Sequence, residues 1–231
     1  MLLAYSLVSV MGGEVSAVTE EYLEGIYRLQ EKSGVAKTSE IVMWLKVAPG
    51  TVTNTVERLE KAGLLTHEPY RGVKLTEEGL KIALRVIRRH RLTERLLTDI
   101  LHVEWDKAHN AACRLEHGIT DDIDKNLEKA LGHPKTCPHG NPIPTKRGGV
   151  FEEKSKPLTS LSPREEGVIA RIRDEEPELL RYLATLGLKP GTNIEVLEKA
   201  PFNGPITVKV AGTSRALSSK VASVVQVKKS Q

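Results

Sequence analysis

The sequence predicts a mainly α-helical protein that contains a winged helix-turn-helix near its start and a small β-barrel at its end. Helix starts and apolar residues at helical spacing recur from Thr19 to Leu131. Two short strands interrupt the helices and enclose a four-residue turn. After Leu161 the pattern changes to short alternating strands with one short helix. A chain of 231 residues is long enough for more than one such domain.

Composition excludes several classes of protein. Hydrophobic residues make up 39% and aromatic residues 4%, and we find no apolar run long enough to cross a bilayer. Two cysteines exclude a disulfide framework and are typical of a reducing cytoplasm, where we expect the protein to reside. The apolar start, MLLAYSLVSVM, lacks a basic region and a cleavage site, so it predicts no secretory signal. It is an extra strand, a disordered arm, or an extension before a natural start at Met11.

The first half of the chain has the elements of a winged helix-turn-helix. We expect helices over 19–31, 38–45 and 49–62, with Pro49 as the first residue of the third. Strands over 64–68 and 73–75 follow as a hairpin. Two helices joined by a tight turn and followed by a hairpin are typical of DNA-binding proteins.

Polar side chains and positive charge both favour nucleic-acid binding by this module. The third helix is expected to expose Thr51, Thr53, Asn54 and Thr55 near its start, where base edges would be met. From Lys37 to Arg95 there are 12 basic and 7 acidic residues, a charge of +5, which leaves −1 for the remainder. A winged helix used only for protein contacts is the alternative. The predicted DNA contacts are Lys46, Thr51, Thr53, Asn54, Arg58, Arg71 and Lys74.

Further helices and then strands follow the hairpin. A long helix is expected from Thr76 to about Leu101, a second, capped by Asp106, through His117, and a third, capped by Thr120, over 121–131. Glycines and prolines predict an irregular loop over 132–149 and a linker over 152–160. The terminal barrel is expected to contain a strand over 167–173, a helix over 177–184 and strands over 193–197, 206–210 and 224–227.

Metal-ligand residues are concentrated in one stretch of the chain. Six of the seven histidines and both cysteines lie between residues 90 and 139. His90 and Glu94 stand four residues apart on one face of the long helix. On the next predicted helix, one face carries His109, Cys113, Glu116 and His117. Each residue alone could be ordinary packing or a solvated ion pair, but six such ligands on two neighbouring helices predict a metal site.

The types of ligand limit which metal fits. Imidazoles, carboxylates and one thiolate suit Fe(II), Mn(II), Co(II), Ni(II) or Zn(II), and they differ from a cysteine-rich structural zinc site. The sequence shows no pairing of metal ligands with a general base, as in a hydrolase, and no CxxC redox pair. A thiol dyad of Cys113 with His109 or His117 is the enzymatic alternative, but no glycine-rich loop for an oxyanion adjoins Cys113.

These residues resemble the diphtheria-toxin-repressor family of metal-dependent transcriptional repressors, which includes iron-dependent and manganese-dependent regulators. The matching stretches occur in family order from about residue 18 to 145. The tail resembles the family's third, Src-homology-type barrel, the same module as the ferrous-transport A domain. The stretches are TEEYLEGIYRL, VAPGTVTNTVERLEKAGLL, PYRGVKLTEEG, RRHRLTERLLTDIL, KAHNAACRLEHGIT, CPHGNPIP and LRYLATLGLKPGTNIEVLEKAPFNGPITVKVAG.

The resemblance implies a regulatory primary metal site. It would combine Cys113, Glu116 and His117 with ligands from the first helix. The iron branch has a methionine where this chain has Glu21, whereas the manganese branch has acids matched by Glu21 and Glu24. The manganese branch usually has a glutamate in place of Cys113. The sequence is therefore a hybrid of the two branches, in which Cys113 favours Fe(II), with Mn(II) next.

The resemblance also implies an ancillary site. It would use His90, Glu94 and His109 with an acid from the barrel domain, for which Glu176 aligns best and Glu175 and Glu178 are the neighbours. Some members add a Cys-x-His pair from the loop. Cys137 and His139 match that pair, and a solvated loop is the alternative for both.

The implied protein is a repressor, not an enzyme, that binds palindromic operator DNA as a homodimer when metal ties the first helix to the later ones. Three alternatives stay open: a winged-helix protein with a purely structural metal, the thiol enzyme, and a transport adapter acting through the barrel. We divide the chain into an extension, a winged helix-turn-helix, a helical metal-binding and dimerisation domain, a linker and a barrel domain, at residues 1–15, 16–80, 81–150, 151–160 and 161–231.

Overall fold

The computed structural model describes residues 15–68, 70–151 and 153–229. The chain divides into two compact units. The first runs to Ile87 and includes residues 146–148, and the second contains residues 88–145 and the chain from Gly149 onward. The N-terminal extension and the start proposed at Met11 lie outside the described residues, apart from Val15. None of the described helices has both the length and the apolar character needed to cross a membrane.

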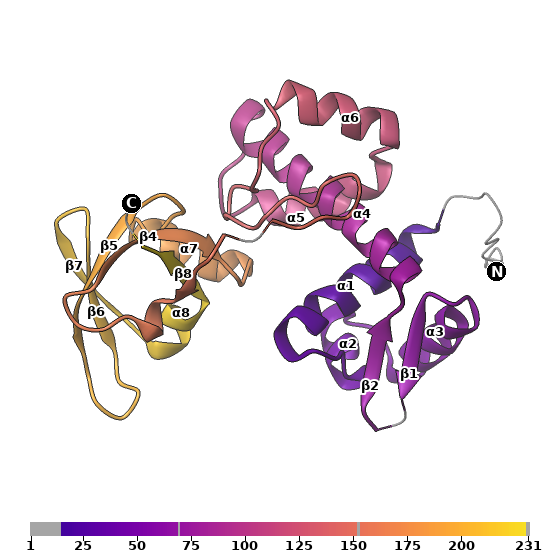
Figure 1. Cartoon of the computed structure of the whole chain (residues 1–231), viewed down its shortest axis with the longest axis horizontal. Coiled ribbons are helices and arrows are strands. Elements are labelled where there is room, and N and C mark those ends of the chain that lie inside the picture. The colour runs from indigo at the N-terminus through magenta and orange to yellow at the C-terminus, as the bar shows by residue number, and fades with distance from the viewer. Residues whose placement is uncertain (1–14, 69, 152, 230–231) are drawn as a thin grey trace. The chain divides into compact units, whose positions relative to one another are not determined.

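The first unit contains the helix-turn-helix and its wing (Figure 1). One apolar core joins its helices and hairpin, and it includes Leu23 of the first helix and Val52, Val56 and Leu59 of the third. The predicted winged helix-turn-helix is confirmed in its order of elements. These are α1 (Ala17–Ser33), α2 (Thr38–Leu45), α3 (Pro49–Lys61), β1 (Leu65–Glu68) and β2 (Gly72–Leu75).

Hydroxyl side chains cap the N-termini of α1 and α4. Helix α1 begins two residues before Thr19, because Ser16 is the N-cap and its hydroxyl accepts a hydrogen bond from the Thr19 amide. Helix α4 (Glu77–Arg95) begins as predicted, with the Thr76 hydroxyl accepting from the Gly79 amide at 3.2 Å. A π-helix over Leu96–Ile100 continues α4 to the predicted end.

The next helix is shorter than the sequence predicts. Helix α5 (Ala108–Leu115) is followed by a single 3-10 turn, Glu116–Gly118, so Glu116 and His117 leave the α-helical face. Asp106 is not its N-cap, because Lys107 occupies that position, and the Asp106 carboxylate accepts a hydrogen bond from Arg181 Nε at 3.0 Å. Helix α6 (Asp121–Ala130) follows the predicted cap, Thr120.

The C-terminal sheet is open, so the predicted closed barrel is wrong. Its six strands are antiparallel in the order β3-β8-β4-β5-β6-β7, and the outer strands β3 and β7 do not pair with each other. Closure depends on that pairing, and β3 is only two residues long. The strands are β3 (Lys156–Pro157), β4 (Glu166–Ile172), β5 (Asn193–Lys199), β6 (Ile206–Val210), β7 (Thr213–Leu217) and β8 (Val225–Lys228).

Several elements of this sheet domain escaped prediction. Strand β7 follows β6 after a tight turn in which Ala211 has φ 48° and Gly212 has φ 80°. Alanine is not a usual residue at positive φ, so the turn carried no hairpin signal. Helix α8 (Ser219–Val224) and helix α7 (Pro177–Thr185) lie along the same side of the curved sheet (Figure 1). The predicted linker contains β3 and a 3-10 turn, Leu158–Ser160.

The irregular loop over 132–149 is confirmed, and arginines of α4 hold it in place. Arg88 Nη1 donates to the Pro144 carbonyl at 2.9 Å, and Arg95 Nε donates to the Thr136 carbonyl at 2.7 Å. Arg91 donates to the carbonyl of Pro142 in the same way. Because buried carbonyls need donors, these side chains replace the hydrogen bonds that a strand or helix would supply.

Gly140 allows this loop to approach β4 closely. The Ile172 amide donates to the His139 carbonyl at 2.9 Å. Gly140 has φ +85°, and a Cβ atom there would lie 2.1 Å from the Ala170 carbonyl oxygen. Only glycine fits this position without displacing the loop or the strand.

We predict that Gly140→Ala destabilises the second unit more than Gly132→Ala does. Gly132 lies in the same region at φ +70°, and a Cβ atom there would have nothing within 4 Å, so its substitution tests backbone strain alone. Strain costs roughly 1–2 kcal/mol in the free energy of unfolding, and the overlap at Gly140 adds roughly 1–3 kcal/mol. Urea denaturation of both variants measures the difference, and equal losses would contradict close packing at Gly140.

Candidate functional site

Two groups of residues are candidates for function: the exposed face of α3 with the wing, and the buried histidines, carboxylates and cysteines of the second unit. On α3, the side chains of Thr51, Thr53, Asn54 and Arg58 are exposed as predicted. Thr55 is only 9% exposed and belongs to the core side of the helix, which corrects its predicted exposure. The exposed set is short and polar, as contacts with base edges require.

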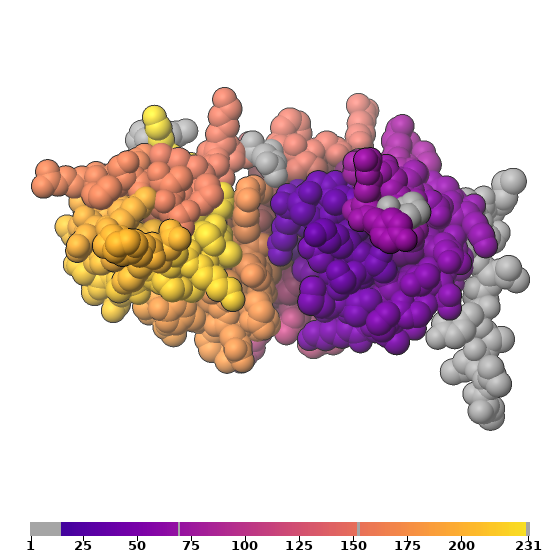
Figure 2. Space-filling view, turned by 90° about the horizontal axis from the view of Figure 1, so that it is seen from below, coloured from indigo at the N-terminus to yellow at the C-terminus, as the bar shows by residue number. Residues whose placement is uncertain are grey.

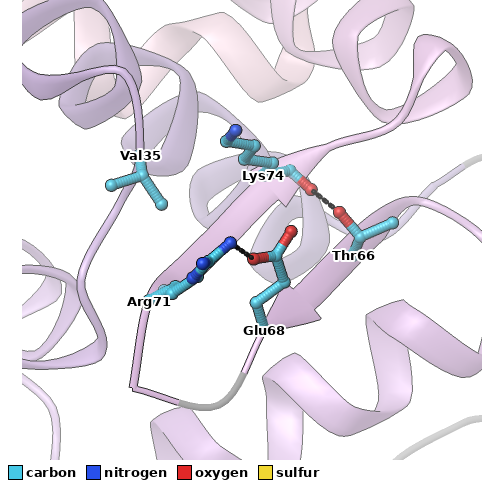
Figure 3. A pocket seen from close by; sticks show the side chains of 6 residues that line it. Val35, Thr66, Glu68, Arg71 and Lys74 are labelled. Atoms are coloured by element: carbon cyan, nitrogen blue, oxygen red, sulfur yellow. Dashed lines mark hydrogen bonds and ion pairs between the residues drawn. The ribbon is translucent and has the colours of Figure 1, made fainter.

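The wing presents two more of the predicted DNA contacts. Arg71 and Lys74 are exposed on the hairpin, which lies at the surface of the first unit (Figure 2). They line an open pocket of about 360 Å³ together with Val35, Thr66 and Glu68 (Figure 3). Arg71 Nη1 lies 3.2 Å from Glu68 Oε2, and this ion pair directs the guanidinium along the wing. Lys46, the remaining predicted contact, is exposed in the turn after α2.

The positive charge of this module is smaller than the sequence indicated. The count of +5 runs to Arg95 and includes Arg88, Arg89, Arg91 and Arg95, which belong to the second unit. From Lys37 to residue 87 there are 8 basic and 6 acidic residues, which gives +2. The electrostatic argument for DNA binding therefore rests on the exposed cations of the turn, α3 and the wing more than on net charge.

Glu94 lies at the centre of the buried cluster in the second unit. Its side chain is fully buried, and its Oε1 atom faces three imidazoles. The distances from Oε1 are 3.1 Å to His90 Nε2, 3.2 Å to His109 Nδ1 and 3.3 Å to His139 Nδ1. The predicted pairing of His90 with Glu94 on one helix face is thus a buried arrangement and not a solvated one.

Glu175, not Glu176, supplies the acid from the C-terminal domain. Glu175 Oε2 lies 3.3 Å from His109 Nδ1, and Glu175 Oε1 lies 3.5 Å from His139 Nδ1. Glu176 caps α7 instead, and its Oε2 accepts from the Glu178 amide at 2.8 Å. Three acids lie within four positions at this point of the chain, so the sequence could not show which of them the turn before α7 directs inward.

Cys137 and His139 are buried members of the cluster and not parts of a solvated loop. They are 1% and 0% exposed. Cys137 Sγ lies 3.9 Å from Glu175 Oε1. His139 Nε2–H donates to the Trp105 carbonyl at 3.0 Å, which leaves Nδ1 directed at the carboxylates.

Sequence reasoning missed two residues that support the cluster. The Trp105 ring packs on His139 with ring centroids 4.9 Å apart. Asn141 Nδ2 donates to Glu175 Oε1 at 2.8 Å and fixes that carboxylate. Neither residue lies at a sequence spacing that indicates a role in metal binding. The one weak signal was the position of Asn141 close after a Cys-x-His pair in a proline-rich loop.

Three residues of the predicted primary site lie in this unit, and two of them, Cys113 and Glu116, contact His90. His90 Nδ1 and Glu116 Oε2 are 2.5 Å apart. Cys113 Sγ lies 4.0 Å from the same nitrogen, and His117 Nε2 lies 3.5 Å from Glu116 Oε1. The bend into the 3-10 turn after α5 keeps these residues together despite the shorter helix.

Glu21 and Glu24, the remaining primary ligands predicted, lie on α1 in the first unit. Glu24 is 8% exposed and pairs with Arg28, whose Nε lies 2.8 Å from Glu24 Oε1. Glu21 is exposed. Arg28 stands one helical turn after Glu24, at the spacing that brings two side chains together on one helix face.

Burial and mutual charge shift the pKa values in the cluster. Burial alone lowers the pKa of His109, but Cys113, Glu94 and Glu175 outweigh it and raise the pKa to about 9. Desolvation raises the pKa of the Cys113 thiol, but His109 and His90 outweigh it and bring the pKa to about 7. Burial raises the pKa of Glu94, yet the surrounding histidines hold it well below its usual range.

These residues fit a divalent transition metal. Glu94 Oε2 and His139 Nδ1 are buried side-chain atoms that make no hydrogen bond within the described ranges. Unsatisfied buried acceptors are costly, and a cation relieves them. Imidazole nitrogens, carboxylate oxygens and a thiol together suit a borderline ion such as Fe(II), Mn(II), Co(II) or Zn(II).

Three family models match consecutive parts of the chain. Residues 14–73 match the N-terminal DNA-binding domain of iron-dependent repressors. Residues 76–145 match the metal-binding and dimerisation domain of the same proteins. Residues 156–229 match the FeoA domain.

Relatives match almost the entire chain. The diphtheria toxin repressor of Corynebacterium glutamicum is 33% identical over 91% of this chain and 96% of its own length. The iron-dependent repressor IdeR of Mycobacterium tuberculosis is 34% identical over 94% and 99%. A manganese-dependent transcriptional repressor in complex with manganese superposes with a TM-score of 0.83 at 31% identity, covering 91% of this chain and 99% of that one. The chain therefore belongs to the iron-dependent repressor family, the metal-dependent transcriptional repressors that include the diphtheria toxin repressor.

Proposed function

We propose that this protein is a repressor that binds palindromic operator DNA as a homodimer when loaded with a divalent transition metal, Fe(II) in preference to Mn(II). The observation that carries the proposal is one chain holding both an exposed winged helix-turn-helix and a buried cluster of imidazoles, carboxylates and thiols. The cluster has the ligands of a metal site, and its donors are mostly buried, whereas the open pocket described above belongs to the wing. We infer a regulator and not an enzyme.

In the primary site, Cys113, Glu116 and His117 would hold the ion together with Glu21 and Glu24 of α1. Without metal, Glu116 and the two acids of α1 would repel one another if brought together. When bound, the ion supplies positive charge that neutralises these carboxylates. Cys113 would lose its proton easily, because its pKa is already lowered to about 7.

Packing in the first unit supports an effect of a ligand on α1 on DNA binding. Leu23 and Ile26 of α1 share one core with Val52 and Val56 of α3. A constraint on α1 is therefore passed to the recognition helix by rigid packing and not by a flexible link. A coupling free energy of about 1–3 kcal/mol between metal and DNA is enough to switch occupancy.

A homodimer is supported by apolar side chains exposed on the second unit. Ile100, Leu101, Leu115 and Ile123 are 42–58% exposed in the helical part of that unit. Burying them against a second copy would remove apolar surface from water. Two recognition helices could then enter successive major grooves of a palindromic site.

We predict that His117→Ala abolishes metal-dependent DNA binding and leaves the fold intact, because His117 is partly exposed and belongs to none of the buried apolar clusters of the described residues. The probe is a duplex selected from a random pool on the metal-loaded wild type, and binding is measured by fluorescence anisotropy. Anaerobic titrations with Fe(II) and Mn(II), run side by side, test the metal preference. A variant that still binds this duplex in a metal-dependent way would contradict the primary site.

A purely structural metal is the alternative function, and contacts of Cys137 and Asn141 with Glu175 support it, because they link the loop to the C-terminal domain. Removal of the metal by a chelator distinguishes the two functions. Circular dichroism and anisotropy are followed together as metal is removed. A regulator releases DNA and stays folded, whereas a structural ion unfolds the second unit when it leaves.

We predict that Lys74→Ala and Asn54→Ala weaken DNA binding in different ways. Loss of a phosphate contact at Lys74 should weaken binding to every sequence and reduce the slope of log K against log salt by about 1. Loss of a base contact at Asn54 should cost about 1–3 kcal/mol at the selected site only and leave that slope unchanged. A wild-type affinity that does not change with salt would exclude DNA binding by this face.

We predict that the metal-free protein loses stability as the pH rises from 6.5 to about 9. His109 has a folded-state pKa of about 9 against an ordinary value of 6.5, so its stabilising contribution is complete below pH 6.5 and is lost as the pH rises through 9. Thermal melts of wild type and His109→Gln across this range measure the effect. The variant should lose less stability than wild type, and equal losses would show that His109 carries no bound proton.

A further inference from the structure

The outer edge of strand β2 is covered by the end of α1 and the segment that follows that helix. β2 pairs with β1 in a two-stranded sheet, so the backbone groups on its other side need partners from elsewhere. The Val73 amide donates to the Ala36 carbonyl at 2.8 Å, and the Ala36 amide donates to the Val73 carbonyl at 3.0 Å. Ala36 comes two residues after Gly34, the C-cap of α1, so the wing is attached where that helix ends.

Gln30 of α1 supplies the partner for the next outward-facing amide of β2. Its Oε1 atom accepts a hydrogen bond from the Leu75 amide at 2.9 Å, across 45 residues of sequence. Val73 and Leu75 are two positions apart in the strand, so their amides point to the same side. The carboxamide oxygen of Gln30 therefore takes the place of a backbone carbonyl in a third strand.

The other end of β2 approaches the same segment closely. Gly72 has φ +121°, and a Cβ atom there would lie 2.6 Å from the Ala36 carbonyl oxygen and 2.9 Å from Val35 Cγ2. Val35 lines the wing pocket together with Arg71 and Lys74 (Figure 3). The end of α1 and the chain just after it thus contact β2 along its length, within the first unit.

The Gln30 contact differs in kind from the apolar core that joins α1 to α3. Apolar packing is non-directional, whereas a hydrogen bond requires its donor and acceptor to be aligned. The bond to Leu75 therefore sets the position of β2 relative to α1. Leu75 directly follows Lys74, one of the predicted phosphate contacts, so this constraint acts next to a residue proposed to touch DNA.

We propose that Gln30 is a positioning residue that ties the wing to α1 and holds Arg71 and Lys74 in place for contact with DNA phosphates. The proposal rests on the proposed function and adds to it a second route from α1 to DNA. The core sets the recognition helix α3, and Gln30 sets the wing. A metal that fixes α1 through Glu21 and Glu24 would then act on both DNA-binding elements.

Two variants of the full chain test the hydrogen bond. Gln30→Met keeps the length of the side chain and removes the acceptor, whereas Gln30→Glu keeps an oxygen in the same position. Amide hydrogen exchange at Leu75 is followed by NMR, with Val73 as the internal control because its partner is the Ala36 backbone. We expect Gln30→Met to speed exchange at Leu75 roughly tenfold, as the loss of one hydrogen bond allows, and to leave Val73 unchanged. Gln30→Glu should restore protection, and equal exchange at Leu75 in the two variants would overturn the proposal.

The salt dependence of DNA binding shows whether the tie acts through the wing. The metal-loaded protein and the selected duplex are used, and Gln30→Met is measured alone and in an Arg71→Ala/Lys74→Ala double variant. The double variant should reduce the slope of log K against log salt by about 2. Gln30→Met alone should weaken binding and reduce the slope part of the way, and it should add nothing to the double variant. An equal loss of affinity in both backgrounds would reveal a general structural defect and overturn the proposal.

A measurement on the wild type keeps the proposal testable if a variant fails to fold. A scalar coupling through the hydrogen bond, between the Leu75 nitrogen and the side-chain carbonyl carbon of Gln30, detects the contact directly. Its absence would overturn the proposal.

Failure of the proposed function is distinguishable from failure of this inference. DNA affinity that ignores metal would contradict the metal-dependent repressor, and the exchange and salt results would still decide the role of Gln30. Metal-dependent DNA binding in a protein whose Leu75 amide is unprotected would do the reverse.

Discussion

The buried carboxylate of Glu94 is the constraint on which the arrangement of the second unit depends. An ionised group without solvent is costly unless opposite charges surround it. His90, His109 and His139 approach it from α4, α5 and the loop over 132–149, each within 3.3 Å. Elements far apart in the sequence are thus brought together around the negative charge of Glu94. A divalent cation would compensate the same charge when the histidines are neutral.

One of the histidines that compensate the charge of Glu94, His139, lies in an irregular loop, which must therefore hold a defined position. The loop contains Cys137 and His139 but no helix or regular strand, so its carbonyls take hydrogen bonds from Arg88, Arg91 and Arg95. Gly140 then allows contact with β4. The same arginines account for much of the positive charge that the sequence assigned to the DNA-binding module. In the structure they donate hydrogen bonds to the loop that carries Cys137 and His139, the proposed metal ligands.

The first unit packs α1, which carries Glu21 and Glu24, in one apolar core with α3. α1 has acids on its surface and apolar residues in a core shared with α3. Because this core is close-packed, a ligand that fixes α1 also limits α3. Rigid packing within a small module is therefore the physical basis of the proposed coupling between a metal ligand on α1 and the DNA-binding helix α3.

The sequence by itself determined the order of the elements from α1 to α6, the recognition helix with its wing, and the histidines, cysteines and Glu94 of the buried cluster. These follow from local rules of capping, periodicity and ligand chemistry, and from family resemblance for the loop pair. Only the tertiary structure decided that Glu175 and not Glu176 turns inward, that Cys137 and His139 are buried, and that the sheet stays open. Each depends on contacts between distant segments, such as Asn141 with Glu175 or β3 with β8, which no local pattern encodes.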